Sequence, residues 1–130
     1  MFRPATLDDT GRLYRWRLED ELAADYPAAT TFNDHHRWLC ARIANPLVRL
    51  LVWEHDGKPT GMVRVDSNGE LAYHSTDSAQ TEPMLRAALE YAAWYGGRLK
   101  ATLDADDLKT TDLRDTGFTS YPAVALIYRP

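Results

Sequence analysis

The sequence contains little of what marks a secreted, disulfide-bonded or membrane protein. Cys40 is its only cysteine, so no disulfide can form within the chain. The stretch from Met1 to Asp9 lacks the apolar run of a secretory signal peptide. No segment has the roughly 20 consecutive apolar residues that a membrane-spanning helix needs. We therefore expect a cytoplasmic protein with no membrane partner.

Excess positive charge and metal-binding motifs are also missing. The 15 Lys and Arg residues are outnumbered by 19 Asp and Glu, which gives a net charge of -4. This sign argues against nucleic acid as a partner, because binding to phosphates relies on bulk attraction. The sequence has neither C-x-x-C nor H-E-x-x-H, and the adjacent His35 and His36 would diverge by about 100° on a helix. We expect no metal site.

What is present suits one folded domain spanning residues 1–130. Hydrophobic residues make up 45% of the chain, and 3 Phe, 7 Tyr and 4 Trp supply bulky material for a core. No internal repeat, low-complexity tract or linker divides the sequence. The composition therefore indicates a globular α and β domain, which local patterns define further.

Local patterns in the first third of the chain predict a strand and two helices. Thr6 and Asp9 form a variant capping box, and apolar residues then recur at three- and four-residue steps, as on an amphipathic helix. Asn33 or Asp34 would cap the second helix. The elements expected here are a strand over 2–6, a helix from 6 to about 26 and a helix from about 33 to 45.

The rest of the chain alternates between aliphatic or β-branched runs and helical segments. Turn signals at 56–57 and 67–69 separate three strands of an antiparallel meander, and a helical segment begins at about Pro83. The expected elements are strands over 48–55, 61–66 and 70–76, a helix over 83–95, a strand over 99–103, a helix over 106–116 and a strand over 123–128. The order β-α-α-β-β-β-α-β-α-β predicts an α/β fold with a mixed, mostly antiparallel sheet flanked by helices.

Short strings spread along nearly the whole chain add a family likeness. They run from Arg3 to Asp9, from Leu13 to Arg17, from His36 to Leu39, at Asn45-Pro46, from Leu50 to Arg64, and from Leu113 to Phe118. In this order they resemble the GNAT superfamily, whose members transfer an acetyl group from acetyl-CoA to an amine. The likeness is closest to the branch that includes amino-sugar and ribosomal-protein acetyltransferases.

The resemblance implies a GNAT-like fold with acetyl-CoA as cofactor. In that fold two neighbouring strands splay apart and bind the pantetheine arm, and the next helix offers its N-terminal N–H groups to the pyrophosphate. On this likeness the residues nearest the cofactor would lie at the end of the fourth strand, at the start of the third helix and before the fourth helix. They are Tyr73, Ser78, Ala79, Gln80, Thr81, Glu82 and Asp106.

The same segment departs from the family pattern. The family's glycine-rich Q/R-x-x-G-x-G/A loop corresponds here to residues 75–83, and no Gly, Lys or Arg occurs from Glu70 through Leu85. Asp77 and Glu82 would place negative charge where phosphates should sit, which weakens cofactor binding. Leu113 stands where the family often has a tyrosine general acid, and Asp106 stands in place of an asparagine.

His74, at the end of the fourth strand, is the candidate catalytic base, with Ser75 beside it. A neutral imidazole can take a proton from an amine near neutral pH. The alternative is a strand-end histidine that only bonds backbone. Trp16, Arg17, Asp20 and Tyr121 are the candidate substrate residues, with Glu19 nearby, although charges on an amphipathic helix often only face solvent.

These residues support more than one hypothesis about function. The first is an acetyl-CoA-dependent N-acetyltransferase acting on a primary amine of a small molecule, such as an amino sugar. The second is a catalytically silent protein of the same fold that binds a protein partner, and either form could be a homodimer. The third is acyl transfer to a macromolecule, which the sequence does not separate from the first.

Overall fold

The computed structural model describes residues 1–23, 31–91, 98–102, 109–121 and 125–128. Its first sheet has four antiparallel strands in the order β1-β2-β3-β4. These strands are β1 (Phe2–Pro4), β2 (Arg49–His55), β3 (Lys58–Val65) and β4 (Leu71–Ser75). A smaller antiparallel sheet has the order β5-β7-β6, formed by β5 (Leu99–Thr102), β6 (Thr119–Tyr121) and β7 (Ala125–Tyr128). The prediction of a mixed α/β fold is confirmed.

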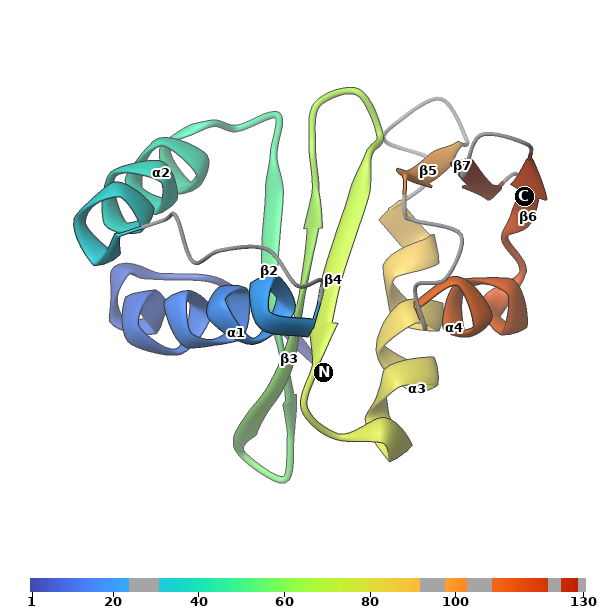
Figure 1. Ribbon diagram of the computed structural model, residues 1–130, viewed down its shortest axis with the longest axis horizontal. Helices are drawn as coiled ribbons and strands as arrows, with labels where there is room; N and C mark the ends of the chain where they lie inside the picture. Colours follow the sequence, from blue (N-terminus) through green and yellow to red (C-terminus); the bar gives the residue numbers. More distant parts are fainter. Residues whose placement is uncertain (24–30, 92–97, 103–108, 122–124, 129–130) are drawn as a thin grey trace.

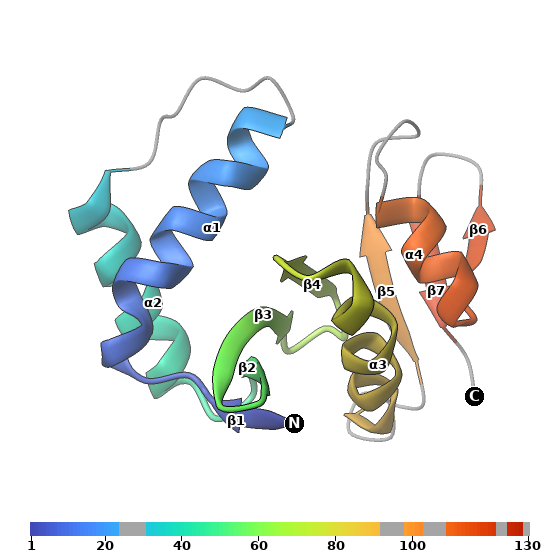
Figure 2. The same cartoon turned by 90° about the horizontal axis from the view of Figure 1, so that it is seen from below.

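Helices cover both faces of the first sheet (Figure 2). On one side lie α1 (Thr10–Ala23), which follows a 3-10 turn at Leu7–Asp9, and α2 (Phe32–Ala44). On the other side lies α3 (Ser78–Ala88), and α4 (Lys109–Thr116) packs beside α3. No helix in the described part of the chain is both long and apolar enough to cross a membrane.

Alternation along β3 and β4 produces two separate hydrophobic clusters. Val63 and Val65 of β3 and Leu71 and Tyr73 of β4 pack with α3, β5 and α4. The residues between them in sequence point to the opposite face, where a second cluster gathers around Leu39 and Trp16. The members of that cluster are Ala5, Leu13, Trp16, Leu39, Leu50 and Val52, with Trp38 and Met62 packed against it.

The two sheets meet at one end of β4 and separate at the other. Glu70 and Lys100 form a single parallel bridge, and the Lys100 N–H donates to the carbonyl oxygen of Gly69 at 3.0 Å. Figure 1 shows β5 beside the start of β4 and away from its end. The C-terminal end of β4, which carries His74 and Ser75, therefore lies away from β5.

Several boundaries differ from the sequence prediction. The helix α3 begins at Ser78 with Asp77 as its N-cap, and it contains Pro83, which the sequence places at the helix start. Proline removes only one helical N–H, and the Asp77 cap stabilises the turn before it. Thr31, not Asn33 or Asp34, caps α2, since its side chain accepts from the Asp34 N–H.

In the C-terminal part the prediction missed β6, which holds three residues and gives only a weak pattern. The strands β5 and β7 follow the prediction, apart from residues 103 and 123–124 outside the described part. The expected start of the fourth helix at 106–108 also lies outside it, as do the ends expected for the first and third helices.

Gly61 of β3 faces a space too small for any side chain. A Cβ atom at this position would lie 2.7 Å from the carbonyl oxygen of His74 and 2.7 Å from the sulfur of the buried Met84. We expect Gly61→Ala to lower the free energy of unfolding by about 1–3 kcal/mol, because β4 or Met84 has to move. Urea unfolding followed by circular dichroism measures the change.

Gly11 provides the matched control for that substitution. It lies in α1, and a Cβ atom added there would have nothing within 4 Å, so Gly11→Ala should stabilise the protein by about 0.5–1 kcal/mol. If both alanine variants changed stability in the same direction, the close approach of β4 at Gly61 would not be the cause.

Candidate functional site

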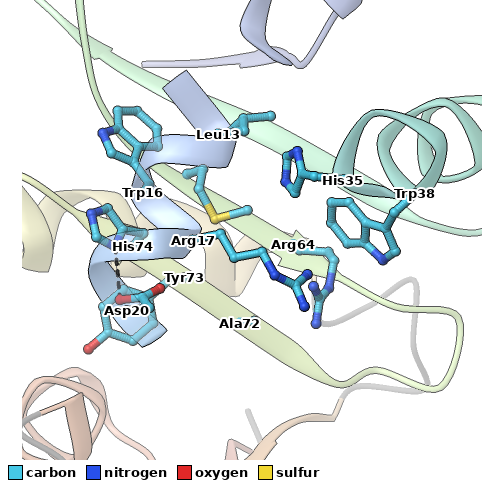
Figure 3. A pocket seen from close by; sticks show the side chains of 11 residues that line it. Leu13, Trp16, Arg17, Asp20, His35, Trp38, Arg64, Ala72, Tyr73 and His74 are labelled. Atoms are coloured by element: carbon cyan, nitrogen blue, oxygen red, sulfur yellow. Dashed lines mark hydrogen bonds and ion pairs between the residues drawn. The ribbon is translucent and has the colours of Figure 1, made fainter. Parts of the chain in front are cut away.

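A cavity of about 130 Å³ lies between the paired helices α1 and α2 and the sheet face formed by β3 and β4. Figure 3 shows its lining side chains. They are Leu13, Trp16, Arg17 and Asp20 from α1, His35 and Trp38 from α2, and Met62, Arg64, Ala72, Tyr73 and His74 from the strands. The cavity therefore draws on four elements and is walled by both apolar and charged groups.

Sequence spacing explains why these residues share one space. The lining residues of α1 stand three, one and three positions apart, which places them along one side of a helix. Met62 and Arg64 alternate on β3, and they pair with His74 and Ala72 of β4 across the strands. On this face of the sheet, His74 of β4 therefore lies opposite Asp20 of α1.

His74 occupies the end of the cavity at the C-terminal end of β4. Its Nδ1 lies 3.0 Å from Asp20 Oδ1 and its Nε2 lies 3.1 Å from Glu19 Oε2. Its ring stacks on Trp16 with centroids 5.5 Å apart and an angle of 19° between the planes. The side chain is 10% exposed, whereas the two carboxylates are about half exposed.

These contacts define a particular hydrogen-bonding state of His74. Carboxylates only accept hydrogen bonds, so a ring that satisfies Glu19 and Asp20 together must carry a proton on both nitrogens. In this arrangement the ring has no lone pair to offer an amine. Among the described residues the side chain bonds two carboxylates, whereas the alternative considered above is a strand-end histidine that bonds backbone.

Two guanidinium groups line the same cavity. In the view of Figure 3, the side chains of Arg17 and Arg64 both point away from His74 and Asp20. The guanidinium carbons of Arg64 and Arg42 each lie over the Trp38 ring, 5.4 Å from its centroid. The Asp66 carboxylate forms ion pairs with Arg64 and Arg42, at 3.4 Å from Arg64 Nε and 3.4 Å from Arg42 Nη1. Arg64 is thereby fixed by an aromatic ring and a carboxylate.

The connection between β4 and α3 consists only of Thr76 and Asp77. The Asp77 carboxylate accepts the Ala79 N–H at 3.0 Å, and its carbonyl oxygen accepts the Gln80 N–H at 2.9 Å. An acidic side chain of the protein itself therefore caps the helix end at which the family likeness places a pyrophosphate.

Other side chains assigned to the cofactor or to catalysis hydrogen-bond groups of the protein itself. The Tyr73 hydroxyl donates to Asp112 Oδ2 at 2.9 Å, and Thr81 donates to the Ser75 hydroxyl at 2.8 Å. The Ser75 hydroxyl in turn donates to the carbonyl oxygen of Asp77 at 3.0 Å. Ser75 is thus hydrogen-bonded within the turn, whereas its neighbour His74 faces the cavity.

Gln80 and Glu82 also contact other side chains of the protein, whereas Ser78 and Ala79 are exposed. Gln80 accepts from Trp53 Nε1 at 2.9 Å, and Glu82 forms an ion pair with Arg86 at 2.7 Å. Ser78 and Ala79 are exposed at the start of α3. The described side chains at this helix end thus bond other groups of the protein or are exposed, and Asp77 places a carboxylate at the helix N-terminus.

The remaining sequence-predicted positions fall in different places. The candidate substrate residues Trp16, Arg17 and Asp20 line the cavity. Asp106 lies outside the described residues, and only the backbone of Tyr121 is described, in β6. Leu113, at the position of the family's tyrosine, is fully buried. Sequence reasoning missed Arg64, although an arginine among the valines of β3 was the available signal.

Comparison with solved structures identifies the architecture. Aminoglycoside acetyltransferase AAC(6')-Ib in complex with coenzyme A superposes with a TM-score of 0.77 at 16% sequence identity, covering 99% of this chain and 94% of that chain. Spermidine N-acetyltransferase from Vibrio cholerae, in complex with CoA and spermine, gives a TM-score of 0.77 at 11% identity and covers 93% and 81%. An acetyltransferase of the GNAT family from Streptococcus pneumoniae gives 0.68 at 16% identity and covers 98% and 95%.

The chain has the GNAT fold. No family model matches the sequence, and no curated protein matches it either. The GNAT likeness seen in the short sequence strings is thus confirmed at the level of the fold. Within this GNAT fold, the cavity lies on the α1 and α2 side of β4, and the Asp77 cap lies at the following helix.

Proposed function

We propose that this protein is an N-acetyltransferase that acts on a primary amine of a small molecule bound in the cavity. The observation that carries the proposal is the placement of His74 and its partners Glu19 and Asp20 at the C-terminal end of β4, at the end of the cavity. Solved proteins of the same fold are acetyltransferases with bound coenzyme A. Acetyl-CoA, when bound, would supply the thioester and its acetyl group.

The carboxylates of the cavity suit the binding of an ammonium group. Asp20 lines the cavity and Glu19 stands beside it, so a cationic amine gains favourable charge interactions at this end. Trp16 and Trp38 also line the cavity and provide apolar surface for the rest of the molecule. These groups orient the amine toward the end of β4.

His74 then provides the proton acceptor. In a neutral ring one nitrogen keeps its donated hydrogen bond, and the other presents a lone pair that repels the carboxylate opposite it. Glu19 and Asp20 are half exposed, so either can turn toward solvent. The vacated nitrogen accepts a proton from the amine, which gives the doubly protonated ring described above.

The direct test is release of the CoA thiol from acetyl-CoA in the presence of single amines. We expect the purified protein to release thiol with a compact primary amine and to form the corresponding acetamide, identified by mass spectrometry. A tertiary amine of the same size serves as the control, because it has no proton to lose after attack. Absence of acetamide with every primary amine tried would contradict the proposal.

The Asp77 cap favours a second candidate, a silent member of the fold that acts as a protein-interaction module. Calorimetry with acetyl-CoA at millimolar concentration separates the two functions. Measurable heat supports the transferase, whereas no heat and no thermal shift would leave the interaction module. Under the second function, His74→Ala would leave the cellular role intact and substitutions on an exposed apolar patch would abolish it.

Asp77→Asn should strengthen binding of acetyl-CoA about fivefold. Asparagine keeps an oxygen for the Ala79 N–H and removes the negative charge nearest the expected pyrophosphate, which is worth about 1 kcal/mol in a solvated site. Calorimetric titration of both proteins measures the change. Asp34→Asn removes a similar charge near the start of α2 and should leave the affinity unchanged. Equal effects of the two substitutions would show that only net charge matters.

A further inference from the structure

The cavity carries opposite charges in different parts of its lining. Asp20 contributes a carboxylate next to His74, whereas Arg17 and Arg64 direct guanidinium groups away from that pair (Figure 3). A ligand that fills the cavity therefore meets an acidic group and basic groups at once. An amine with no other charged group could form a favourable charge interaction only at the acidic part of the lining.

Arg64 is held in place by Trp38 of the cavity wall and by Asp66. Its guanidinium carbon lies over the Trp38 ring, and its Nε lies 3.4 Å from Asp66 Oδ2. Within the described residues Nε has no hydrogen-bond partner. The distance of 3.4 Å to the Asp66 carboxylate is that of an ion pair, and the geometry is not that of a hydrogen bond. The side chain is 24% exposed. Its charge is thus partly removed from water at the wall of the cavity, where an anion would stabilise it.

The size and the walls of the cavity restrict the ligand further. A cavity of about 150 Å³ in another protein accommodates benzene, so the 130 Å³ here suits an apolar group of about the size of a branched aliphatic side chain. Leu13, Trp16, Trp38 and Met62 provide apolar surface between the charged groups. A polycationic amine such as spermidine is unsuited, because its extra ammonium groups would face Arg17 and Arg64.

We infer that the acceptor is a small amine that also carries a carboxylate, an amino acid with an apolar side chain. Its ammonium group lies at Asp20 and His74, its carboxylate lies at Arg17 and Arg64, and its apolar part packs against Trp16 and Trp38. The inference rests on the proposed function only in treating the cavity as the acceptor site. Binding itself needs no acyl donor.

The test compares ligands that each lose one charged group. L-leucine, leucinamide, 4-methylpentanoate and spermidine are titrated into the full chain without acyl donor, and binding is followed by calorimetry or by NMR chemical shifts. We expect leucine to bind at least tenfold more tightly than leucinamide and tenfold more tightly than 4-methylpentanoate. Spermidine should bind more weakly than leucinamide.

Substitutions assign the preference to the arginines. Arg64→Gln and, separately, Arg17→Gln should reduce the ratio of leucine to leucinamide affinity to about two or less, while leucinamide affinity stays within about twofold. Retained leucinamide binding shows that each variant is folded, and either variant alone suffices if the other does not fold. Arg37→Gln removes an exposed arginine of α2 that pairs with Asp34 outside the cavity and should keep the wild-type ratio.

The outcomes separate the inference from the proposed function. Equal binding of leucine and leucinamide to the wild-type protein, or an unchanged ratio in both arginine variants, would overturn the inference. Thiol release from acetyl-CoA at equal rates with leucine and leucinamide would also overturn it while supporting acetyl transfer. Selective leucine binding without any thiol release would retain the inference and contradict the transferase.

Discussion

A His74→Gln variant is expected to lose acetyl transfer by a factor of about 100 to 1,000 in kcat/KM, because a positioned general base contributes roughly that much. Glutamine can still hydrogen-bond the neighbouring carboxylates, but its amide cannot take a proton from the amine. Because such bonds to Asp20 and Glu19 remain available, we expect the fold to survive the change. Thiol release with the best amine substrate, measured over a range of pH, gives the loss.

Two further variants show whether His74 acts on the amine. Asp20→Asn should lower kcat/KM by about tenfold, because it weakens orientation of the ring and binding of the ammonium but leaves the imidazole in place. His55→Gln changes an exposed histidine at the end of β2 and should have no effect. If His74→Gln kept activity within about twofold of wild type with an unchanged pH profile, His74 would be a structural residue.

The elements that the sequence predicted well are those with a strong local pattern. The amphipathic steps of α1 and the alternation along β3 and β4 report directly on which side chains are buried. Turn signals at Gly57 and Gly69 were also reliable, since both glycines have positive φ angles of 76° and 81°. In these segments the residues that favour the local backbone conformation are also the ones that the tertiary packing needs.

The parts that were missed depend on partners distant in sequence. The start of α3 was placed at Pro83 because proline is common in a first helical turn, yet the Asp77 cap begins the helix earlier. The short strand β6 exists through its pairing with β7. Such pairing leaves little trace in three residues.

The same reason limited prediction of the site. His74 and its carboxylate partners are 54 and 55 positions apart in the chain. The sequence could therefore indicate each of them as a candidate, but it could not predict that they are in contact. Arg64 looked like an ordinary solvent-facing residue of a strand, and only the packing of α2 reveals that Trp38 covers it. The family likeness predicts a cofactor segment before α3, and the structure adds that Asp77 caps this helix.

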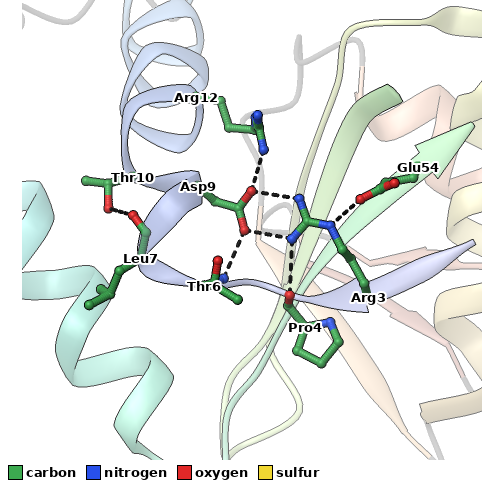
Figure 4. Close-up of polar contacts among 8 residues, drawn as sticks. All are labelled: Arg3, Pro4, Thr6, Leu7, Asp9, Thr10, Arg12 and Glu54. Atoms are coloured by element: carbon green, nitrogen blue, oxygen red, sulfur yellow. Dashed lines mark hydrogen bonds and ion pairs between the residues drawn. The ribbon is translucent and has the colours of Figure 1, made fainter. Parts of the chain in front are cut away.

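Asp9→Asn is the substitution with the largest expected loss of stability. Asp9 is 1% exposed and lies in the 3-10 turn before α1. Its two oxygens accept from Arg3 at 2.8 Å each, and Oδ2 also accepts the Thr6 N–H at 2.9 Å (Figure 4). Arg12 contacts Oδ1 as well. The backbone bond to Thr6 confirms that Asp9 reaches back as the capping-box pattern predicted.

An asparagine at this position cannot replace these contacts. Its NH₂ group would face the N–H donors of Arg3 and Arg12, and the remaining oxygen would carry no charge. Breaking a buried, hydrogen-bonded ion pair costs several kcal/mol, but both arginines are about one-third exposed and can regain water. We expect a loss of about 2–3 kcal/mol and a fall in Tm of about 10 °C. Thermal and urea unfolding at neutral pH measure it.

The pH dependence of this loss identifies the Asp9 carboxylate as its source. Burial alone would raise the pKa of Asp9, but hydrogen bonds from Arg3 and Thr6 and the charges of Arg3 and Arg12 together lower it below its ordinary value of 3.8. A carboxyl with a lowered folded-state pKa stabilises the protein above its unfolded-state pKa, and this contribution disappears as pH falls through the folded-state value. The stability difference between wild type and Asp9→Asn should therefore be constant above about pH 5 and shrink below about pH 4.

Asp8→Asn is the matched control, because Asp8 is the exposed neighbour of Asp9 in the same turn. We expect it to change stability by at most about 0.5 kcal/mol, as for most surface substitutions. Equal losses in the two variants would assign the effect to the charge of the helix N-terminus. A loss in Asp9→Asn that persisted unchanged down to about pH 2 would assign it to steric disturbance of the turn, since the carboxyl of the unfolded wild-type chain takes up a proton below about pH 4 and the stabilisation by the Asp9 charge must then shrink.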